Sequence, residues 1–444
     1  MPYFIILFAI FFFGGQFYAY YRLWHIIPCV WLRWAVLIIA IVAAVFFLVS
    51  MFFADSLPIR ATSTLYKVGT GWFFILLELI VLFLVVDLLR LLPFLHISNL
   101  LNNSWIGFVG VVALIGGMMV YGNINYRTPQ RTEIIVADGG STATSDHHCG
   151  LDKQFTEEQP LSDRNCGYNK QSPLKIVFAS DLHIGYSIGA NEIAKWVSLI
   201  NKENPDIIIF GGDIIDNSTR PLFADSTIAS LFRSLKARYG VYGILGNHEY
   251  ISQRGRTLKN STDPTYKEVQ EAAATATAPD ADIADSKLSV KENYTNQGGK
   301  LPEVERFYRE AGIMLLRDTV VNIAGQLLLI GRDDYSNLQR NTLEKVLTVI
   351  PDSIRSNLPT ILLDHQPRNL NQTAANGITL QLSGHTHAGQ LIPINWITKL
   401  IYENDYGLLK KDSTTIYVTS GLGIWGGKFR IGTKSEYVVI NLTK

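Results

Sequence analysis

The chain has 444 residues, of which 48% are hydrophobic, and its formal net charge is +1. That length predicts two or three structural units. The near-neutral balance of charges excludes a surface built to bind nucleic acid or another polyanion. With three cysteines, the chain is not a protein held together mainly by disulfides.

Charged residues are scarce up to about residue 122 and common after it. This change predicts a membrane region over residues 1–124 and a soluble domain over residues 125–444. Each apolar stretch in the first region is close to the ~20 residues that a helix needs to cross the ~30 Å of membrane hydrocarbon. We therefore predict four transmembrane helices, at about Tyr3–Tyr21, Trp34–Phe53, Gly71–Leu89 and Trp105–Tyr121.

Two features of this region need separate interpretation. The first stretch lacks basic residues at its start and three more spans follow, so we favour an uncleaved span over a signal peptide. Glu78 lies inside the third stretch, where an ionisable group hints at function. No transport motif surrounds it, and we interpret it as a protonated or hydrogen-bonded carboxyl group. Basic residues are almost evenly divided between the two sides, which leaves the orientation in the membrane open.

Two polar inserts interrupt the soluble domain, at residues 137–172 and 251–300. Cys149 and Cys166 lie in the first insert without a paired C-x-x-C spacing, so we favour an exposed loop, with or without a disulfide between them, over a metal site. The second insert lacks apolar periodicity, which predicts an insertion rather than a domain. It directly follows the Asn247-His248-Glu249 motif described below, and it is either a lid over that motif or a surface loop that the fold tolerates.

Between and after the inserts, strand-like and helix-like segments alternate. Helices are predicted at Asn191–Glu203 and Leu222–Arg238, and strands at Asp206–Phe210 and Val241–Leu245. Such alternation implies crossover units whose active residues lie beyond the carboxyl ends of the strands. Further strands are predicted to form a second sheet, at Ile361–Leu363, Leu380–Leu382, Ile416–Thr419 and Tyr437–Leu442.

Metal-binding residue types follow several of these strands. Asp181 and His183 are two residues apart in an extended segment, so both side chains project the same way and can hold one ion. Asp213 follows a strand and a Gly-Gly pair, and one carboxylate can bridge two ions ~3.5–4 Å apart. At the ends of other segments lie Asn247, His365, His385 and His387. These seven side chains, with Asp213 shared, suffice for two ions.

The donor types indicate which metals and which neighbours matter. Nitrogen and mixed oxygen ligands suit Mn, Fe or Zn better than Mg. Asp216, Glu249 and Asp364 either orient the ligand imidazoles or serve only as a helix cap and loop polar groups. Arg430 either reaches a substrate phosphate or is a surface charge at a strand edge.

The ordered motifs resemble the calcineurin-like metallophosphoesterase superfamily: Asp181-x-His183, Gly212-Asp213, Gly246-Asn247-His248-Glu249, His365 and Gly384-His385-Thr386-His387. With the run Gly421–Gly426, they look most like its membrane-associated bacterial branch and transmembrane proteins with a metallophosphoesterase domain. The resemblance covers about residues 130–444 and implies a four-layer α/β/β/α sandwich, here preceded by the four membrane helices. The departures are the two inserts and Ala388, where glycine is expected.

The resemblance also implies residue roles. One divalent ion would be held by Asp181, His183, Asp213 and His387. The other would be held by Asp213, Asn247, His365 and His385. His248 would contact the phosphoryl group or protonate the leaving oxygen.

The leading hypothesis is a membrane-anchored, dinuclear-metal phosphoesterase. Its multipass anchor keeps the site near the bilayer, so the expected substrate is a lipid or envelope phosphoester and the expected location is the bacterial inner membrane. The competing hypothesis is a non-catalytic metal- or partner-binding module coupled to a membrane sensor or transporter. The complete ligand set and the retained His248 argue against it, because a scaffold can dispense with both.

Overall fold

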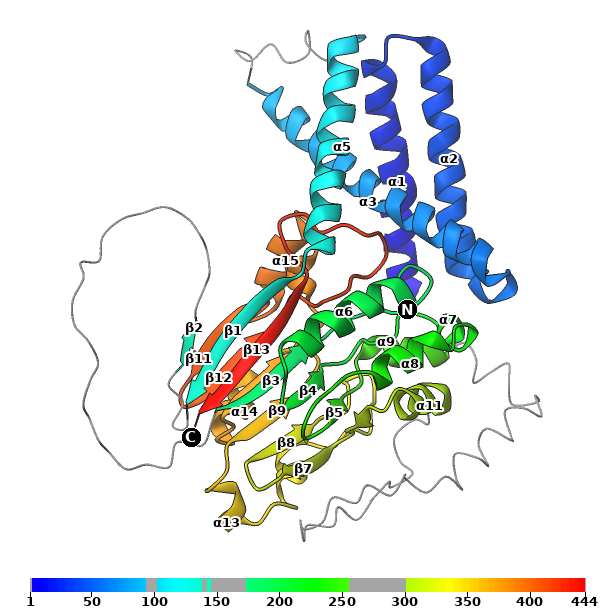
Figure 1. Ribbon diagram of the computed structural model, residues 1–444. Helices are drawn as coiled ribbons and strands as arrows, with labels where there is room; N and C mark the ends of the chain where they lie inside the picture. The colour runs from blue at the N-terminus through cyan, green and yellow to red at the C-terminus, as the bar shows by residue number, and fades with distance from the viewer. Residues whose placement is uncertain (1, 93–101, 138–141, 145–172, 255–300, 444) are drawn as a thin grey trace, which may run out of the picture.

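The computed structural model describes residues 2–92, 102–137, 142–144, 173–254 and 301–443. Most of the two polar inserts, including Cys149 and Cys166, lies outside the described residues. The described chain forms a group of long helices at one end and a domain of two sheets at the other (Figure 1).

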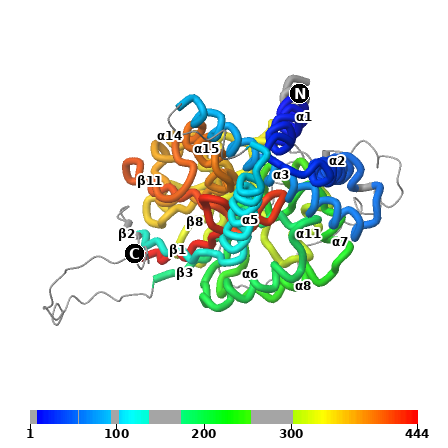
Figure 2. Tube along the Cα trace, turned by 90° about the horizontal axis from the view of Figure 1, so that it is seen from above, coloured from blue at the N-terminus to red at the C-terminus, as the bar shows by residue number. Residues whose placement is uncertain are grey.

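The helical end contains four long helices, α1 (Pro2–Ile26), α2 (Val30–Phe52), α3 (Ile59–Leu89) and α5 (Trp105–Arg127). Of the described helices, α2, α3 and α5 are long and apolar enough to cross a membrane. The sequence predicts four such spans, and the first predicted span falls in α1. Seen from above, α5 lies over the middle of the sheet domain, with α1 and α2 to one side (Figure 2).

Helix α3 differs most from its prediction, because it begins at Ile59 rather than at Gly71. The additional residues lie against the soluble domain. Ser63 donates a hydrogen bond to the backbone oxygen of Tyr186 at 2.7 Å. One continuous helix therefore contacts the sheet domain at its amino end and continues into the apolar bundle.

The first sheet has seven strands in the order β2-β1-β13-β3-β4-β5-β6. Their bounds are β1 Gln130–Ala137, β2 Thr142–Thr144, β3 Leu174–Ala179, β4 Ile207–Phe210, β5 Val241–Gly243, β6 Met314–Leu315 and β13 Glu436–Thr443. The last strand was predicted to join the second sheet, and this is wrong. β13 pairs parallel with β1 and antiparallel with β3, and it thereby joins the strand that follows α5 to the rest of the sheet.

The second sheet has six strands in the order β11-β12-β10-β9-β8-β7. Their bounds are β7 Thr319–Ile323, β8 Leu327–Gly331, β9 Thr360–Leu363, β10 Leu380–Ser383, β11 Gly407–Lys411 and β12 Thr414–Val418. Strands β8, β9, β10 and β12 pair in parallel, with an antiparallel strand at each edge.

The alternation of side chains along β3 shows how the layers stack. Ile176 and Phe178 point into the core between the two sheets, while Val177 and Ala179 pack against the helices outside. The first sheet is covered by α6 (Ala190–Lys202), α8 (Thr227–Arg233) and α11 (Pro302–Glu310). The second is covered by α12 (Leu343–Leu347) and α14 (Leu370–Ala375). The fold is therefore the α/β/β/α sandwich that the resemblance implies.

The helix predicted at Leu222–Arg238 is instead two shorter helices, α7 (Arg220–Ala224) and α8. Asp225 lies between them in an extended conformation, and its carboxylate accepts a hydrogen bond from the backbone N–H of Thr227 at 3.1 Å. A carboxylate that accepts from the backbone two residues further on forms a turn between the two helices, which apolar periodicity alone does not reveal.

The helical end and the sheet domain share an apolar interface. Phe74 of α3 is fully buried, and its ring centroid lies 5.4 Å from that of Trp425. From α5, the side-chain amide of Asn123 donates to the backbone oxygen of Lys428 at 2.9 Å, and that of Asn125 donates to the backbone oxygen of Arg430 at 3.1 Å. The loop before β13 thus contacts α3 and α5, two of the helices that are long and apolar enough to cross a membrane.

Replacing Phe74 with alanine tests this interface. We expect the Phe74→Ala protein to lose about 3–5 kcal/mol of stability, because a buried aromatic ring leaves a cavity that the neighbours fill only in part. Thermal unfolding in detergent measures the change. Leu84→Ala, at an exposed position of the same helix, is the control, and an equal loss in both variants would contradict the packing described.

Candidate metal centre

The candidate ligands lie where strands of both sheets end. Asp181 and Asp213 follow β3 and β4, which are parallel neighbours with Ala179 opposite Phe210. In the second sheet, His365 follows β9 and the His385/His387 pair follows β10. Carboxyl ends of parallel strands meet at one edge of a sheet. Here the carboxyl ends of strands from both sheets also lie next to each other.

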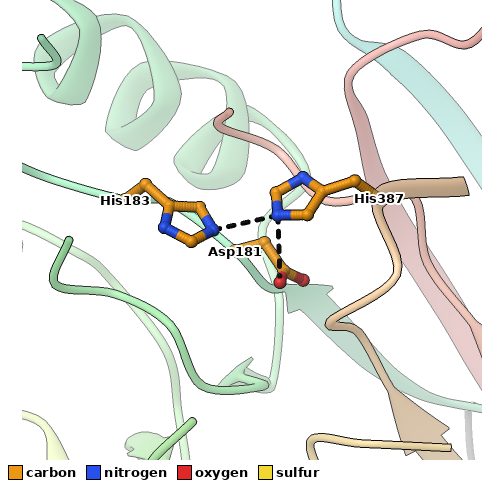
Figure 3. Close-up of side chains that lie close together, drawn as sticks. All are labelled: Asp181, His183 and His387. Atoms are coloured by element: carbon orange, nitrogen blue, oxygen red, sulfur yellow. Dashed lines mark hydrogen bonds and ion pairs between the residues drawn. The ribbon is translucent and has the colours of Figure 1, made fainter. Parts of the chain in front are cut away.

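Three of the candidate ligands form a first cluster. The Nε2 atoms of His183 and His387 lie 2.9 Å apart, and His387 Nε2 lies 3.5 Å from Asp181 Oδ1 (Figure 3). All three side chains are buried. One oxygen and two nitrogens therefore converge on a single point inside the protein.

The remaining candidate ligands form a second cluster beside the first. Asp213 Oδ2 lies 3.2 Å from His365 Nε2, and Asn247 Oδ1 lies 2.8 Å from His385 Nδ1. The same Asp213 oxygen lies 3.9 Å from His183 Nε2 of the first cluster. The structure thus brings all seven predicted ligands together, with Asp213 between the two groups.

The backbone at these positions is strained. Five candidate ligands have φ in the left-handed region, at values of 48° to 73°: Asp181, His183, Asp213, His385 and His387. Such a conformation costs a non-glycine residue roughly 1–3 kcal/mol. Hydrogen bonds hold it in place, because the Asp181 and His183 N–H groups donate to the backbone oxygens of Gly212 and Asp213 at 3.0 Å. Ala388 also has a left-handed φ, of 50°, which explains why glycine is expected there.

Two motif glycines are required by close packing. A Cβ atom on Gly246 would collide with Asp213 Oδ1, and one on Gly384 would collide with Asp181 Oδ2. Each glycine leaves space for a carboxylate of the site. The Gly-Asn-His-Glu and Gly-His-Thr-His motifs thus supply candidate ligands and also leave space for the carboxylates of Asp213 and Asp181.

The donor set fits divalent cations. His365 Nδ1 lies 2.8 Å from the backbone oxygen of Gly211, which directs Nε2 toward Asp213, and this Nε2 is buried with no hydrogen-bond partner. Burial lowers the pKa of His385 to about 3 and that of His387 well below its ordinary value. Both rings are then neutral, the form in which imidazole binds a metal.

The two buried carboxylates behave differently. Burial raises the pKa of Asp181, more than the nearby imidazoles lower it. Burial would also raise the pKa of Asp213, but the imidazoles of His365 and His248 outweigh it and hold this pKa well below its ordinary value. A buried carboxylate needs a compensating positive charge, and a cation in each cluster would supply it.

His248 lies beside the clusters but is partly open. Its ring centroid is 4.5 Å from that of His183, and its side chain is 20% exposed. Burial alone would lower its pKa, but the carboxylates of Asp213 and Asp216 raise it to about 9. Among the predicted site residues, Asn247, His248 and His385 are partly exposed and the others are buried, so the centre opens on the side of these three.

Asp216 contacts imidazoles, as one of the two sequence interpretations predicts. Its Oδ1 lies 3.6 Å from His183 Nδ1 and 3.3 Å from His248 Nδ1. Its Oδ2 accepts a hydrogen bond from the Tyr66 hydroxyl at 2.9 Å. Tyr66 belongs to α3, and sequence reasoning missed it because a tyrosine next to an apolar stretch is typical of a membrane interface.

Glu249 and Asp364 do not touch ligand imidazoles. Glu249 is fully buried, and its carboxylate accepts from the backbone N–H groups of Asp213, Ile215 and Gly246 at 2.7–3.1 Å. It therefore fixes the loops that carry the ligands. Asp364 pairs with the Arg340 guanidinium at 2.8 Å instead.

Arg430 was predicted either to reach a substrate phosphate or to be a surface charge, and the structure supports neither. The residue is fully buried. Its Nη2 donates to the backbone oxygens of Ser420, Gly421 and Gly423 at 2.6–3.0 Å and lies 3.4 Å from His387 Nδ1. Arg430 thus joins the loop before β13 to a candidate ligand.

A sandwich of two sheets with two carboxylate–imidazole clusters at its edge is an arrangement that can hold divalent ions. Residues 174–389 match the family model of the calcineurin-like phosphoesterases, and the chain carries a metallophosphoesterase domain of that family.

Two bacterial relatives and one vertebrate relative illustrate the likeness. An uncharacterised metallophosphoesterase of Campylobacter jejuni is 27% identical over 275 residues, 62% of this chain and 60% of that protein. One of Helicobacter pylori is 26% identical over 271 residues, covering 61% and 60%. A bovine protein described as a transmembrane protein with metallophosphoesterase domain is 28% identical over 271 residues, covering 59% and 51%. The match thus spans 60% or less of the length of these three relatives.

The shared position of Asp213 leads to a prediction about metal content. We expect Asp213→Ala to lose both ions, because each cluster loses an oxygen donor, whereas His248→Ala should keep about two ions per chain. Elemental analysis of the purified proteins measures this. Asp352→Ala, at an exposed carboxylate, is the control, and equal metal loss from the Asp213 and His248 variants would refute the assignment.

The hydrogen bond from Tyr66 of α3 to Asp216 leads to a second prediction. We expect Tyr66→Phe to keep its metal and its KM but to lower kcat about 10-fold, since a hydrogen bond to a charged group contributes ~1.5 kcal/mol or more. Steady-state kinetics and metal analysis measure this. The control is Tyr186→Phe, whose ring lies 6.2 Å from that of Tyr66 and whose hydroxyl faces a backbone oxygen. A fall in metal content would show that Tyr66 is only structural.

Proposed function

We propose that the chain is a membrane-anchored, two-metal phosphoesterase. The observation that carries the proposal is the Asp213 carboxylate, one oxygen of which lies within 3.2 and 3.9 Å of imidazole nitrogens from two separate clusters. A carboxylate so placed can bridge two ions, and paired ions ~3.5–4 Å apart are the arrangement that many phosphate-transferring hydrolases use.

Each cluster would hold one divalent ion. The first consists of Asp181, His183, Asp213 and His387, and the second of Asp213, Asn247, His365 and His385. Mn, Fe or Zn suits these donors. When bound, two such ions lower the pKa of a water molecule and neutralise the phosphoryl oxygens during in-line displacement.

The protein's own groups would then complete the reaction. His248 is close to both clusters and partly exposed, so its ring can reach the leaving oxygen and donate a proton to it. Asp216 holds that ring from behind, and the Tyr66 hydroxyl holds Asp216. The buried first cluster excludes bulk water, which strengthens the electrostatic interactions within the site.

The packing of the sheet domain against the long apolar helices supports a substrate that lies in the bilayer. The sheet domain is packed directly against α3 and α5, so the centre stays near a lipid surface rather than moving on a tether. We propose an integral, multipass protein of a bacterial inner membrane that hydrolyses a lipid or envelope phosphoester.

Activity of the full-length protein in detergent tests the reaction. With Mn²⁺, we expect turnover of an aryl phosphodiester or phosphomonoester, its loss on chelation, and its recovery when metal is restored. His248→Ala should lower kcat by about 10²–10⁴, the usual contribution of a general acid. If the parent protein turns over neither ester with Mn, Fe or Zn, the proposal fails and the non-catalytic module is favoured.

A further inference from the structure

Helix α15 (Ile394–Ile401) presents an apolar face that no described residue covers. Its large side chains are strongly exposed: Trp396 60%, Ile397 49%, Leu400 87% and Ile401 67%. A group of exposed apolar side chains this dense marks a surface that another apolar surface meets.

The position of α15 indicates what that surface is. Its first residue, Ile394, and the preceding Leu391 and Ile392 pack in the same apolar cluster as α1, α3 and α5. Figure 1 places α15 at the end of the sheet domain that faces the long helices, beside the lower end of α5. The exposed face of α15 therefore continues the interface that joins the domain to its membrane region.

The residue types fit a lipid surface. Trp396 is an amphipathic ring of the kind that gathers at the membrane–water boundary. Lys399 is exposed on the same short helix, and its charge suits contact with lipid head groups. A helix with this composition lies in the plane of the interface rather than across the membrane.

We propose that α15 inserts its apolar face into the lipid interface and that the metal centre takes its substrate, an amphipathic phosphoester, from that same leaflet. This inference rests on the proposed function and adds the source of the substrate. It commits to the bilayer as the occupant of the α15 face.

Contacts between α15 and the centre support the second half of the proposal. Thr398 donates to the Asp405 carboxylate at 2.8 Å, and the Asp405 backbone oxygen accepts from the Thr386 hydroxyl at 2.6 Å. Thr386 lies between the two histidines His385 and His387. The helix is therefore fastened to the loop that carries two candidate ligands.

The open side of the centre also faces this helix. His385 is one of the partly exposed site residues, and its ring centroid lies 6.0 Å from that of Tyr402, the residue that follows α15. A phosphoester held by the second cluster is thus adjacent to the segment that meets the lipid, which a water-soluble substrate would not require.

Two substrates with the same aryl leaving group test the proposal on the full-length protein in nanodiscs of phosphatidylcholine and phosphatidylglycerol. One is a water-soluble aryl phosphodiester, and the other is a phospholipid with the aryl group on its phosphate. We expect the double variant Trp396→Ser with Leu400→Ser to lose about 10-fold or more in kcat/KM on the lipid and little on the soluble ester, because only lipid turnover depends on interfacial contact. The control is Leu338→Ser, at a 97% exposed leucine outside α15.

The outcomes separate this inference from the proposed function. If the parent hydrolyses the soluble ester but not the lipid, or if the variant retains lipid turnover, the inference is overturned and the phosphoesterase stands. If neither ester is hydrolysed, the proposed function fails, and the substrate part of the inference fails with it.

A measurement without turnover tests the contact itself. Brominated lipids should quench the part of the tryptophan fluorescence that is lost in Trp396→Phe. No quenching of that component would overturn the lipid contact, and cross-linking of Leu400→Cys into dimers would assign the face to a second copy of the chain instead.

Discussion

The burial of two carboxylates at adjoining strand ends is the constraint on which the site depends. Asp181 and Asp213 are almost completely removed from solvent, which is unfavourable for a charged group unless opposite charge or hydrogen bonds compensate. Much of the structure around these two carboxylates follows from their burial. Gly246 and Gly384 lack the Cβ atoms that would displace these carboxylates, and Glu249 fixes the backbone N–H groups beside Asp213. The left-handed conformations at five ligand positions persist because this network holds them.

The long apolar helices are part of the same network. Tyr66 of α3 reaches Asp216 and through it the rings of His183 and His248. On the other side, α5 accepts the Arg430 backbone N–H through Gly122 at 2.9 Å, and the Arg430 guanidinium contacts His387. Both contacts reach residues next to the candidate ligands. The helical region therefore shapes the centre directly.

The sequence predicts the convergence of the ligands well, because local rules govern it. Each motif follows an apolar strand, and parallel strands bring their carboxyl ends to one edge. The sequence predicts poorly the residues that hold these ligands in place. Arg430 looks like a surface charge and Tyr66 like an interfacial aromatic until tertiary packing places them. The sheet to which β13 belongs is also hidden, since Tyr437 and Val439 face one core and Val438 and Ile440 face the other, and a strand buried on both faces has the same apolar pattern in either sheet.

The distribution of exposure around the centre has a consequence for the direction of substrate approach. The first cluster is buried next to the contacts from α3 and the Arg430 loop, so under the proposed function a phosphoester would come from the side of Asn247, His248 and His385. Tyr402 lies on that side, at the end of α15. A lipid in the adjoining leaflet would then present its phosphate to the partly exposed His248 without leaving the bilayer entirely. Under the proposed lipid contact, the apolar face of α15 and the open side of the centre have one explanation, because both would lie where the membrane surface meets the domain.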